Sequence, residues 1–145
     1  MAQPQAPQEI ERLEALAGRW HTEGDVYSST PPSRWSSEEL YEWLPGHRFM
    51  TYRWDAEVGG KPFQGLGVLG HDEKRGAFAS FFDNAGHSPT YELKVEGSTV
   101  RFEGEAQRAT YNLGEDGETM KIHWDVKKDG GWAPLCDLTA RKTDG

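Results

Sequence analysis

The stretch MTYRWDAE, residues 50–57, decides the fold because its side chains alternate in character from one residue to the next. Every second residue is apolar or aromatic: Met50, Tyr52, Trp54 and Ala56. The residues between them, which include Arg53 and Asp55, are polar. Successive side chains of a β-strand point to opposite faces, so the pattern predicts a strand with one face in a core and one in water.

The same period of two recurs along most of the chain after Trp20. TMKIHWDVK, residues 119–127, places Met120, Ile122, Trp124 and Val126 on one face, and TYELKV and STVRFEG repeat the pattern. Turns that contain glycine separate such stretches, as at residues 58–60, 84–86, 96–98, 115–117 and 128–131. Closing a meander into a barrel removes its exposed edges. We therefore predict an all-β fold, a single antiparallel barrel of about ten strands.

The two ends of the chain have a different character. Residues 1–8 are rich in glutamine and proline, which predicts a disordered tail. In EIERLEALAG the apolar residues Ile10, Leu13, Leu16 and Ala17 recur at helical spacing, and Gly18 supplies a stop. A short amphipathic helix therefore precedes the strands. We expect one domain over residues 9–141 and a tail at residues 142–145.

The glycines of GLGVLG, residues 65–70, match the G-x-G-x-x-G spacing of a dinucleotide-binding loop. Such a loop works only between a buried strand and a helix whose N-terminus faces the pyrophosphate. Here a polar turn, HDEKRG, follows, and then AFASFF, which suits another strand. We interpret the stretch as a strand with Leu66 and Val68 on one face and Gly65 and Gly67 on the other. The missing side chains permit bending or a close approach.

Composition excludes several classes of partner. The formal net charge is −8, which repels nucleic acid and anionic membrane surfaces. No apolar run approaches the roughly 20 residues that span a bilayer, so we expect no membrane insertion. The single cysteine, Cys136, forms no intrachain disulfide, and the first residues lack the features of a secretion signal. We therefore expect a cytoplasmic protein.

Four runs carry a resemblance to a known family: LEALAGRW, LPGHRFM, KPFQGLGVLGHDEKRGAFASFF and DGGWAPLCDLTARK. They resemble the bacterial domain-of-unknown-function family 1579 of the calycin superfamily, distantly similar to lipocalins, fatty-acid-binding proteins and nitrobindins. The resemblance covers residues 12–141 and implies a calycin-like barrel closed by an N-terminal helix. Gly18 and Trp20 match the start of the first strand, and Arg141 matches an arginine of the last. The resemblance also implies a structural pair in which the Arg141 guanidinium lies over the Trp20 indole.

A barrel of about ten strands leaves a lumen unless bulky residues fill it. In RWSSEELYEWL, residues 34–44, one face carries Trp35, Ser37, Glu39, Tyr41 and Trp43. If this face points into the barrel, Ser37 and Glu39 lie among aromatic rings in the interior. If the opposite face points into the barrel, Glu38, Leu40 and Glu42 are internal instead. We predict that the lumen binds a small, largely hydrophobic molecule. The expected lining residues are Ser37, Glu39, Tyr41, Tyr52, Trp54, Tyr91 and Trp124.

Two alternative functions use the same chain differently. The first is a cofactor-independent enzyme of the isomerase or cyclase type, in which Glu39 or His87 acts as general acid or base. His87 shares a face with Tyr91 near the barrel rim. The second is a protein-interaction module that exposes tryptophans, namely Trp35, Trp43 or Trp132.

Haem is a third possibility, which the resemblance to nitrobindins implies. The position that matches their axial histidine carries Asp137, a poor substitute for imidazole. A lone buried cysteine such as Cys136 is typically a small core residue. The five histidines show no metal-ligating spacing. We therefore expect no cofactor and no metal, while a monomer and a homodimer are both compatible with the sequence.

Overall fold

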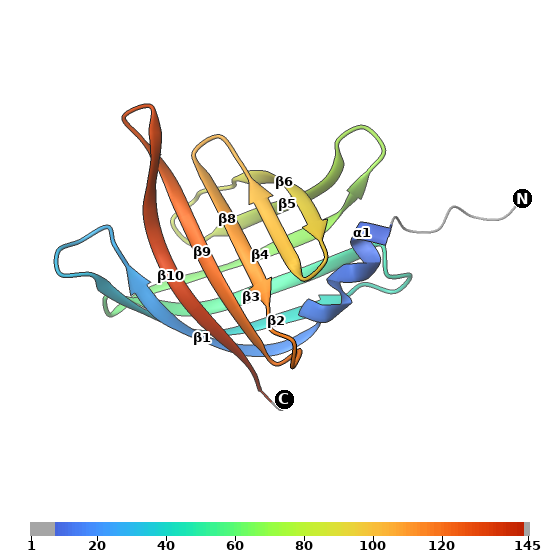
Figure 1. Ribbon diagram of the computed structural model, residues 1–145, viewed down its shortest axis with the longest axis horizontal. Helices are drawn as coiled ribbons and strands as arrows, with labels where there is room; N and C mark the ends of the chain where they lie inside the picture. The colour runs from blue at the N-terminus through green and yellow to red at the C-terminus, as the bar shows by residue number, and fades with distance from the viewer. Residues whose placement is uncertain (1–7, 144–145) are drawn as a thin grey trace, which may run out of the picture.

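A computed structural model describes residues 8–143 of the chain. Within these residues the chain forms a closed barrel of ten antiparallel strands (Figure 1). A helical segment precedes the barrel and consists of α1 (Gln8–Glu11) and the 3-10 helix η1 (Arg12–Leu16). The strands are β1 (Gly18–Val26), β2 (Ser33–Trp43), β3 (Phe49–Val58), β4 (Lys61–Asp72), β5 (Gly76–Asp83), β6 (Thr90–Glu96), β7 (Thr99–Glu103), β8 (Gln107–Leu113), β9 (Thr119–Lys128) and β10 (Gly131–Thr143). The predicted all-β barrel with a short N-terminal helix is confirmed.

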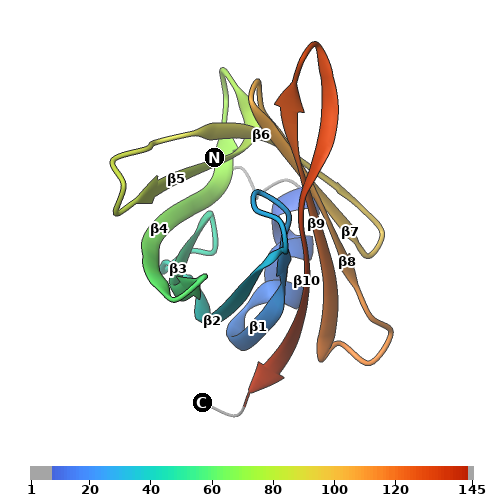
Figure 2. The same ribbon diagram turned by 90° about the vertical axis from the view of Figure 1, so that its left-hand side faces the viewer.

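The strands follow one another around the barrel in the order of the sequence. Each strand pairs with its neighbours in the chain, and β10 returns to pair with β1, so that Val26 lies opposite Cys136. Figure 2 looks along the barrel from the end remote from the helical segment and shows the strands wrapped around a common interior. The closure leaves no edge strand in the described part of the chain, as the turn pattern predicts.

The glycine-rich stretch 65–70 lies entirely inside β4 and leads through a turn into β5. It is a strand, as its context predicts, and the element that follows it is the strand β5. Gly65 and Gly67 face the barrel interior. A Cβ atom on Gly65 would lie 2.2 Å from the Trp54 ring, and one on Gly67 would lie 2.2 Å from the Phe81 ring. The two glycines therefore make room for these rings to pack directly against the strand backbone.

The helical segment closes one end of the barrel (Figure 1). Ile10, Leu13 and Leu16 are completely buried, and so is Trp20 at the start of β1. The Trp20 indole Nε1 donates a hydrogen bond to the Leu16 carbonyl oxygen at 2.8 Å. This bond satisfies a carbonyl at the end of the helical segment and joins the segment to the barrel. Of the predicted tail 1–8, only Gln8 lies within the described residues, where it begins α1.

The predicted pair of Trp20 and Arg141 is wrong by one residue. Across the seam between β1 and β10, Trp20 lies opposite Lys142, whereas Arg141 lies opposite His21 on the outer face. The Lys142 Nζ atom stands 5.4 Å from the centre of the Trp20 ring. A shift of one residue along a strand moves a side chain to the other face, so the cation over the indole is an ammonium.

The last strand also extends beyond the predicted domain end. β10 continues to Thr143, so Lys142 and Thr143 belong to the barrel and not to a tail.

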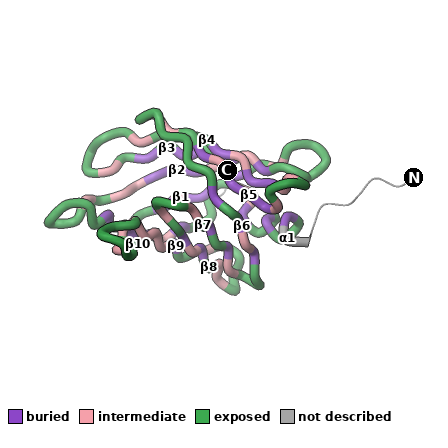
Figure 3. The backbone as a smooth tube through the Cα atoms, turned by 90° about the horizontal axis from the view of Figure 1, so that it is seen from above, coloured by how far each residue is buried: buried purple, intermediate pink, exposed green. Residues whose placement is uncertain are grey.

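The half of the barrel nearest the helical segment is packed solid. Its interior holds the large, fully buried side chains Trp20, Tyr41, Met50, Leu69 and Met120. Figure 3 shows that buried positions recur along the strands while the loops are exposed. The cavity described below lies in the other half of the barrel.

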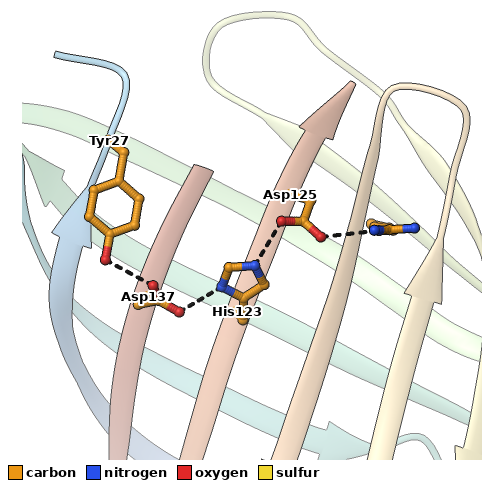
Figure 4. A network of polar contacts seen from close by, with 5 residues as sticks. Tyr27, His123, Asp125 and Asp137 are labelled. Carbon is orange, nitrogen blue, oxygen red and sulfur yellow. Dashed lines mark hydrogen bonds and ion pairs between the residues drawn. The ribbon is translucent and has the colours of Figure 1, made fainter. Parts of the chain in front are cut away.

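A network of polar side chains crosses the outer face of the barrel (Figure 4). The His123 Nδ1 atom lies 2.6 Å from Asp137 Oδ1, and Nε2 lies 2.7 Å from Asp125 Oδ1. The Tyr27 hydroxyl donates to Asp137 at 2.8 Å, and the Arg108 Nε donates to Asp125 at 3.1 Å. Only the imidazolium form of histidine donates from both nitrogens, so the network favours protonated His123. It links β8, β9 and β10 to the chain after β1.

This network predicts a pH dependence of stability. Hydrogen bonding to Asp137 raises the pKa of His123, and hydrogen bonding to Glu38 raises the pKa of His21 in the same way. Stabilisation from a raised histidine pKa is complete below about pH 6.5 and is lost as the pH rises through the raised value. Because both side chains are partly exposed, we expect the free energy of unfolding to fall by about 1 kcal/mol or less.

Urea denaturation between pH 6 and pH 9 measures this loss. The double variant His21→Gln, His123→Gln should show a flatter profile than the wild type over the same range. An equal slope in the two proteins would contradict the assignment to these histidines.

Candidate functional site

A cavity of about 180 Å³ occupies the half of the barrel remote from the helical segment. Its rim lies where β2, β4, β8 and β10 begin and where β5 ends. The helical segment lies at the opposite end of the barrel, where β1 begins. Half of the residues that line it are aromatic: Trp35, Tyr52, Trp54, Phe63, Phe81, Tyr91, Tyr111 and Trp124. The interior is therefore an apolar space bounded by flat rings.

The rings of the wall contact one another in a continuous arrangement. Tyr52 stacks on Tyr41 with ring centres 4.4 Å apart and on Trp54 at 5.3 Å. Phe81 meets Trp54 edge to face at 6.0 Å, and Tyr91 lies 5.5 Å from Phe81. Such contacts hold large side chains in defined orientations, so the wall is rigid and largely preformed.

Glu39 supplies the one carboxyl of the deep part of the cavity within the described residues. Its side chain lies between β1 and β3, opposite Trp20 and Trp54, and is 5% exposed. The Ser37 hydroxyl donates to Glu39 Oε2 at 2.6 Å. Burial raises the pKa of Glu39, and the hydroxyls of Ser37, Tyr52 and Thr22 near the carboxyl oppose this increase only in part. Of these three hydroxyls, only that of Ser37 reaches Glu39 with the distance and angle of a hydrogen bond.

Several buried polar atoms around this carboxyl lack a hydrogen-bond partner. They are Glu39 Oε1, Thr22 Oγ1, the Tyr41 hydroxyl and Trp54 Nε1. A buried polar atom without a partner is uncommon in folded proteins, because it has lost water and gained nothing in return. Two of these atoms belong to residues that line the cavity, Glu39 and Trp54. A molecule in the cavity could satisfy them.

The structure resolves which face of β2 is internal. Ser37, Glu39 and Tyr41 are buried, whereas Glu38 and Glu42 are exposed. Of the seven predicted lining residues, those in the cavity wall are Glu39, Tyr52, Trp54, Tyr91 and Trp124. Ser37 and Tyr41 lie behind the wall, where they contact Glu39 and Tyr52 respectively. The ligand-binding role of all seven stays a prediction.

Sequence reasoning missed part of the wall. Phe81, Tyr111 and Cys136 line the cavity and were not expected there. Tyr111 and its buried neighbour Ala109 follow the period of two in β8, so alternation could have found them. Phe81 lies in β5, where Ala77, Phe78 and Ala79 are buried in succession and the alternation fails.

His87, the second candidate for acid–base catalysis, does not line the cavity. It lies in the loop between β5 and β6, and its side chain is 75% exposed. Its Nδ1 atom stands 3.4 Å from Asp83 Oδ2, and its backbone N–H donates to Asp83 Oδ1 at 3.0 Å. Asp83 is the residue of this pair that reaches the cavity rim.

The three tryptophans considered for a protein-interaction surface have different surroundings. Trp35 lines the cavity, and Trp43 donates to Glu14 and stacks on His47 at 4.8 Å. Trp132 is exposed, but the Arg108 guanidinium stands over its ring at 4.4 Å. These tryptophans do not form one exposed apolar patch.

The residues of the cavity do not fit haem. Asp137, at the position of the expected axial ligand, faces outward and bonds to His123 and Tyr27. Cys136 faces the cavity, but burial raises the pKa of its thiol to about 12, which disfavours the thiolate needed for ligation. No histidine lines the cavity in the described chain, and the volume is below the roughly 300–1,000 Å³ of cofactor-sized pockets.

Within residues 8–143, no group of three or more His, Cys, Asp or Glu side chains could hold a metal ion. No helix in the same range is both long and apolar enough to cross a membrane.

The fold and the cavity define the chain as a closed ten-stranded antiparallel β-barrel with an aromatic interior. It belongs to the family described as protein of unknown function (DUF1579), whose model matches residues 3–142. The predicted family is thus confirmed, while its place in the calycin superfamily stays a prediction. No curated protein matches the chain.

Two solved structures share the fold. The crystal structure of Rv2717c from M. tuberculosis has a TM-score of 0.69 at 14% sequence identity and covers 97% of this chain and 100% of its own. A de novo designed fluorescence-activating β-barrel has a TM-score of 0.51 at 9% identity and covers 90% of this chain and 95% of its own. At these identities the likeness concerns the fold alone.

Proposed function

We propose that the barrel binds a small, largely hydrophobic molecule non-covalently in the cavity between its strands. The observation that carries the proposal is the space of about 180 Å³, half of whose lining residues are aromatic. An engineered apolar cavity of about 150 Å³ is large enough to hold benzene. A ligand the size of one ring with a short substituent therefore suits this space.

The designed fluorescence-activating barrel supports the proposal by analogy of architecture. That protein, a β-barrel of similar fold, is described as fluorescence-activating. The wall of the present barrel is built from Tyr52, Trp54, Tyr91 and Trp124, whose rings provide flat apolar contact.

We prefer binding to catalysis because, of the two residues predicted as general acid or base, only Glu39 lines the cavity in the described residues. Glu39 lies in the wall, whereas His87 points to solvent. A general acid or base must lie within hydrogen-bond reach of the atom that it protonates or deprotonates, and His87 does not line the cavity.

Titration calorimetry with propylbenzene tests the proposal. We expect saturable binding of one molecule to the wild type. Cys136→Phe should weaken it by at least about tenfold, since the added ring occupies the cavity that the ligand needs. Glu57→Phe is a matched control, because it adds the same ring at an exposed position of β3.

Equal binding by the wild type and Cys136→Phe would place the probe outside the cavity and contradict the proposal. Absence of saturable binding to the wild type would contradict it as well.

A further inference from the structure

The charged groups of the cavity are all acidic. Glu39 and Asp83 line it, and no Lys, Arg or His side chain does so in the described residues. The Asp83 side chain is only 11% exposed, and the whole chain carries a net charge of −8. The field of the protein therefore attracts cations toward the cavity and repels carboxylates, including fatty-acid anions.

The hydrogen bonds behind Glu39 fix its role as an acceptor. The Trp35 indole N–H, which can only donate, bonds to the Ser37 hydroxyl oxygen at 2.9 Å. The Ser37 hydroxyl hydrogen is then directed to Glu39 Oε2 at 2.6 Å. The second oxygen, Oε1, has no partner and belongs to a residue of the cavity wall.

A buried carboxylate is costly unless a cation accompanies it. The described cavity provides no such cation, which is why burial raises the pKa of Glu39. The rings of Tyr52 and Trp54 lie beside it, and the faces of aromatic rings attract ammonium groups. An ammonium group in this position would meet both the unpaired oxygen and the ring faces.

We propose that the cavity takes a small organic ammonium ion, with an N–H donated to Glu39 Oε1 and an apolar body held among Tyr52, Trp54 and Trp124. This inference rests on the proposed function and names its ligand class. The body is limited to about one ring by the 180 Å³ volume.

Three probes of similar shape test the inference at pH 7: 2-phenylethylamine, propylbenzene and 3-phenylpropanoate. We expect calorimetry to show that the wild type binds the amine about tenfold or more tighter than propylbenzene, since a charged hydrogen bond adds to the same apolar contact. The carboxylate should bind most weakly. In Glu39→Gln the advantage of the amine over propylbenzene should fall to less than about threefold.

Glu42→Gln is the matched control, because it makes the same change on the exposed face of β2, outside the cavity, and leaves Glu39 unchanged. The amine should keep its advantage in this variant. An advantage that survives Glu39→Gln, or that Glu42→Gln abolishes, would overturn the assignment to Glu39.

The wild-type comparison decides the ligand class even if a variant fails to fold. Binding of propylbenzene without preference for the amine would overturn this inference and leave the proposed function intact. Failure of propylbenzene and the amine to bind would overturn both.

Discussion

Replacement of Trp20 by alanine is expected to lower the free energy of unfolding by about 3–5 kcal/mol, the usual cost of removing a large buried aromatic side chain. Trp20 is completely buried where the helical segment meets the first strand. Its Nε1 atom donates to the Leu16 carbonyl oxygen, and the side chain packs in the solid half of the barrel. Its loss leaves a cavity there and removes the hydrogen bond that joins the segment to the barrel.

Urea denaturation of Trp20→Ala and Trp20→Phe separates the two contributions. The phenylalanine variant keeps most of the apolar contact and loses the hydrogen bond, so we expect a smaller cost of about 1–3 kcal/mol. A cost below about 1 kcal/mol for the alanine variant would show that Trp20 does not hold this end of the barrel closed.

Gly65→Ala is expected to destabilise the barrel by about 1–3 kcal/mol or more, because the interior has no room for the added methyl group. A Cβ atom at this position would lie 2.2 Å from the Trp54 ring and 2.4 Å from the Phe82 carbonyl oxygen. The ring also contacts Tyr52, Phe63 and Phe81, and the carbonyl belongs to the backbone of β5. The strand or the cavity wall must therefore shift.

Gly131→Ala is the matched control for this prediction. A Cβ atom there would be 3.9 Å from its nearest neighbour, the Lys128 carbonyl oxygen, so we expect a change within about 0.5 kcal/mol. Gly65→Ala should also weaken propylbenzene binding, since Trp54 lines the cavity. Equal stability of the two alanine variants would contradict the packing of Trp54 against the β4 backbone.

Alternation of side chains predicted most of the strands, because most of them have one buried face, whereas β5 departs from it with three successive buried residues. The pattern was least informative in β2, because Glu39 lies on one face and Glu38 and Glu42 lie on the other. Either choice of the internal face therefore buried a carboxyl group. The structure resolves this ambiguity through pairing with β1 and β3, which places Glu39 beside Trp20 and Trp54. Such pairing between strands is not visible in one strand alone.

Two other predictions failed or fell short for related reasons. The position of Arg141 was transferred from a resemblance, and an offset of one residue turns the side chain outward and brings Lys142 over Trp20. His87 was placed by counting back from Tyr91, but the intervening loop interrupts the period of two. Alternation is informative only within a continuous strand.

The most direct test of the account is a crystal structure of the protein grown with a brominated propylbenzene. Anomalous scattering from bromine locates the probe without reference to the fit of its ring. We expect one bromine site inside the barrel, within van der Waals distance of Tyr52, Trp54 and Trp124. An interior filled by its own rings, with bromine found only on the outer surface, would contradict the central claim that the barrel holds a small molecule.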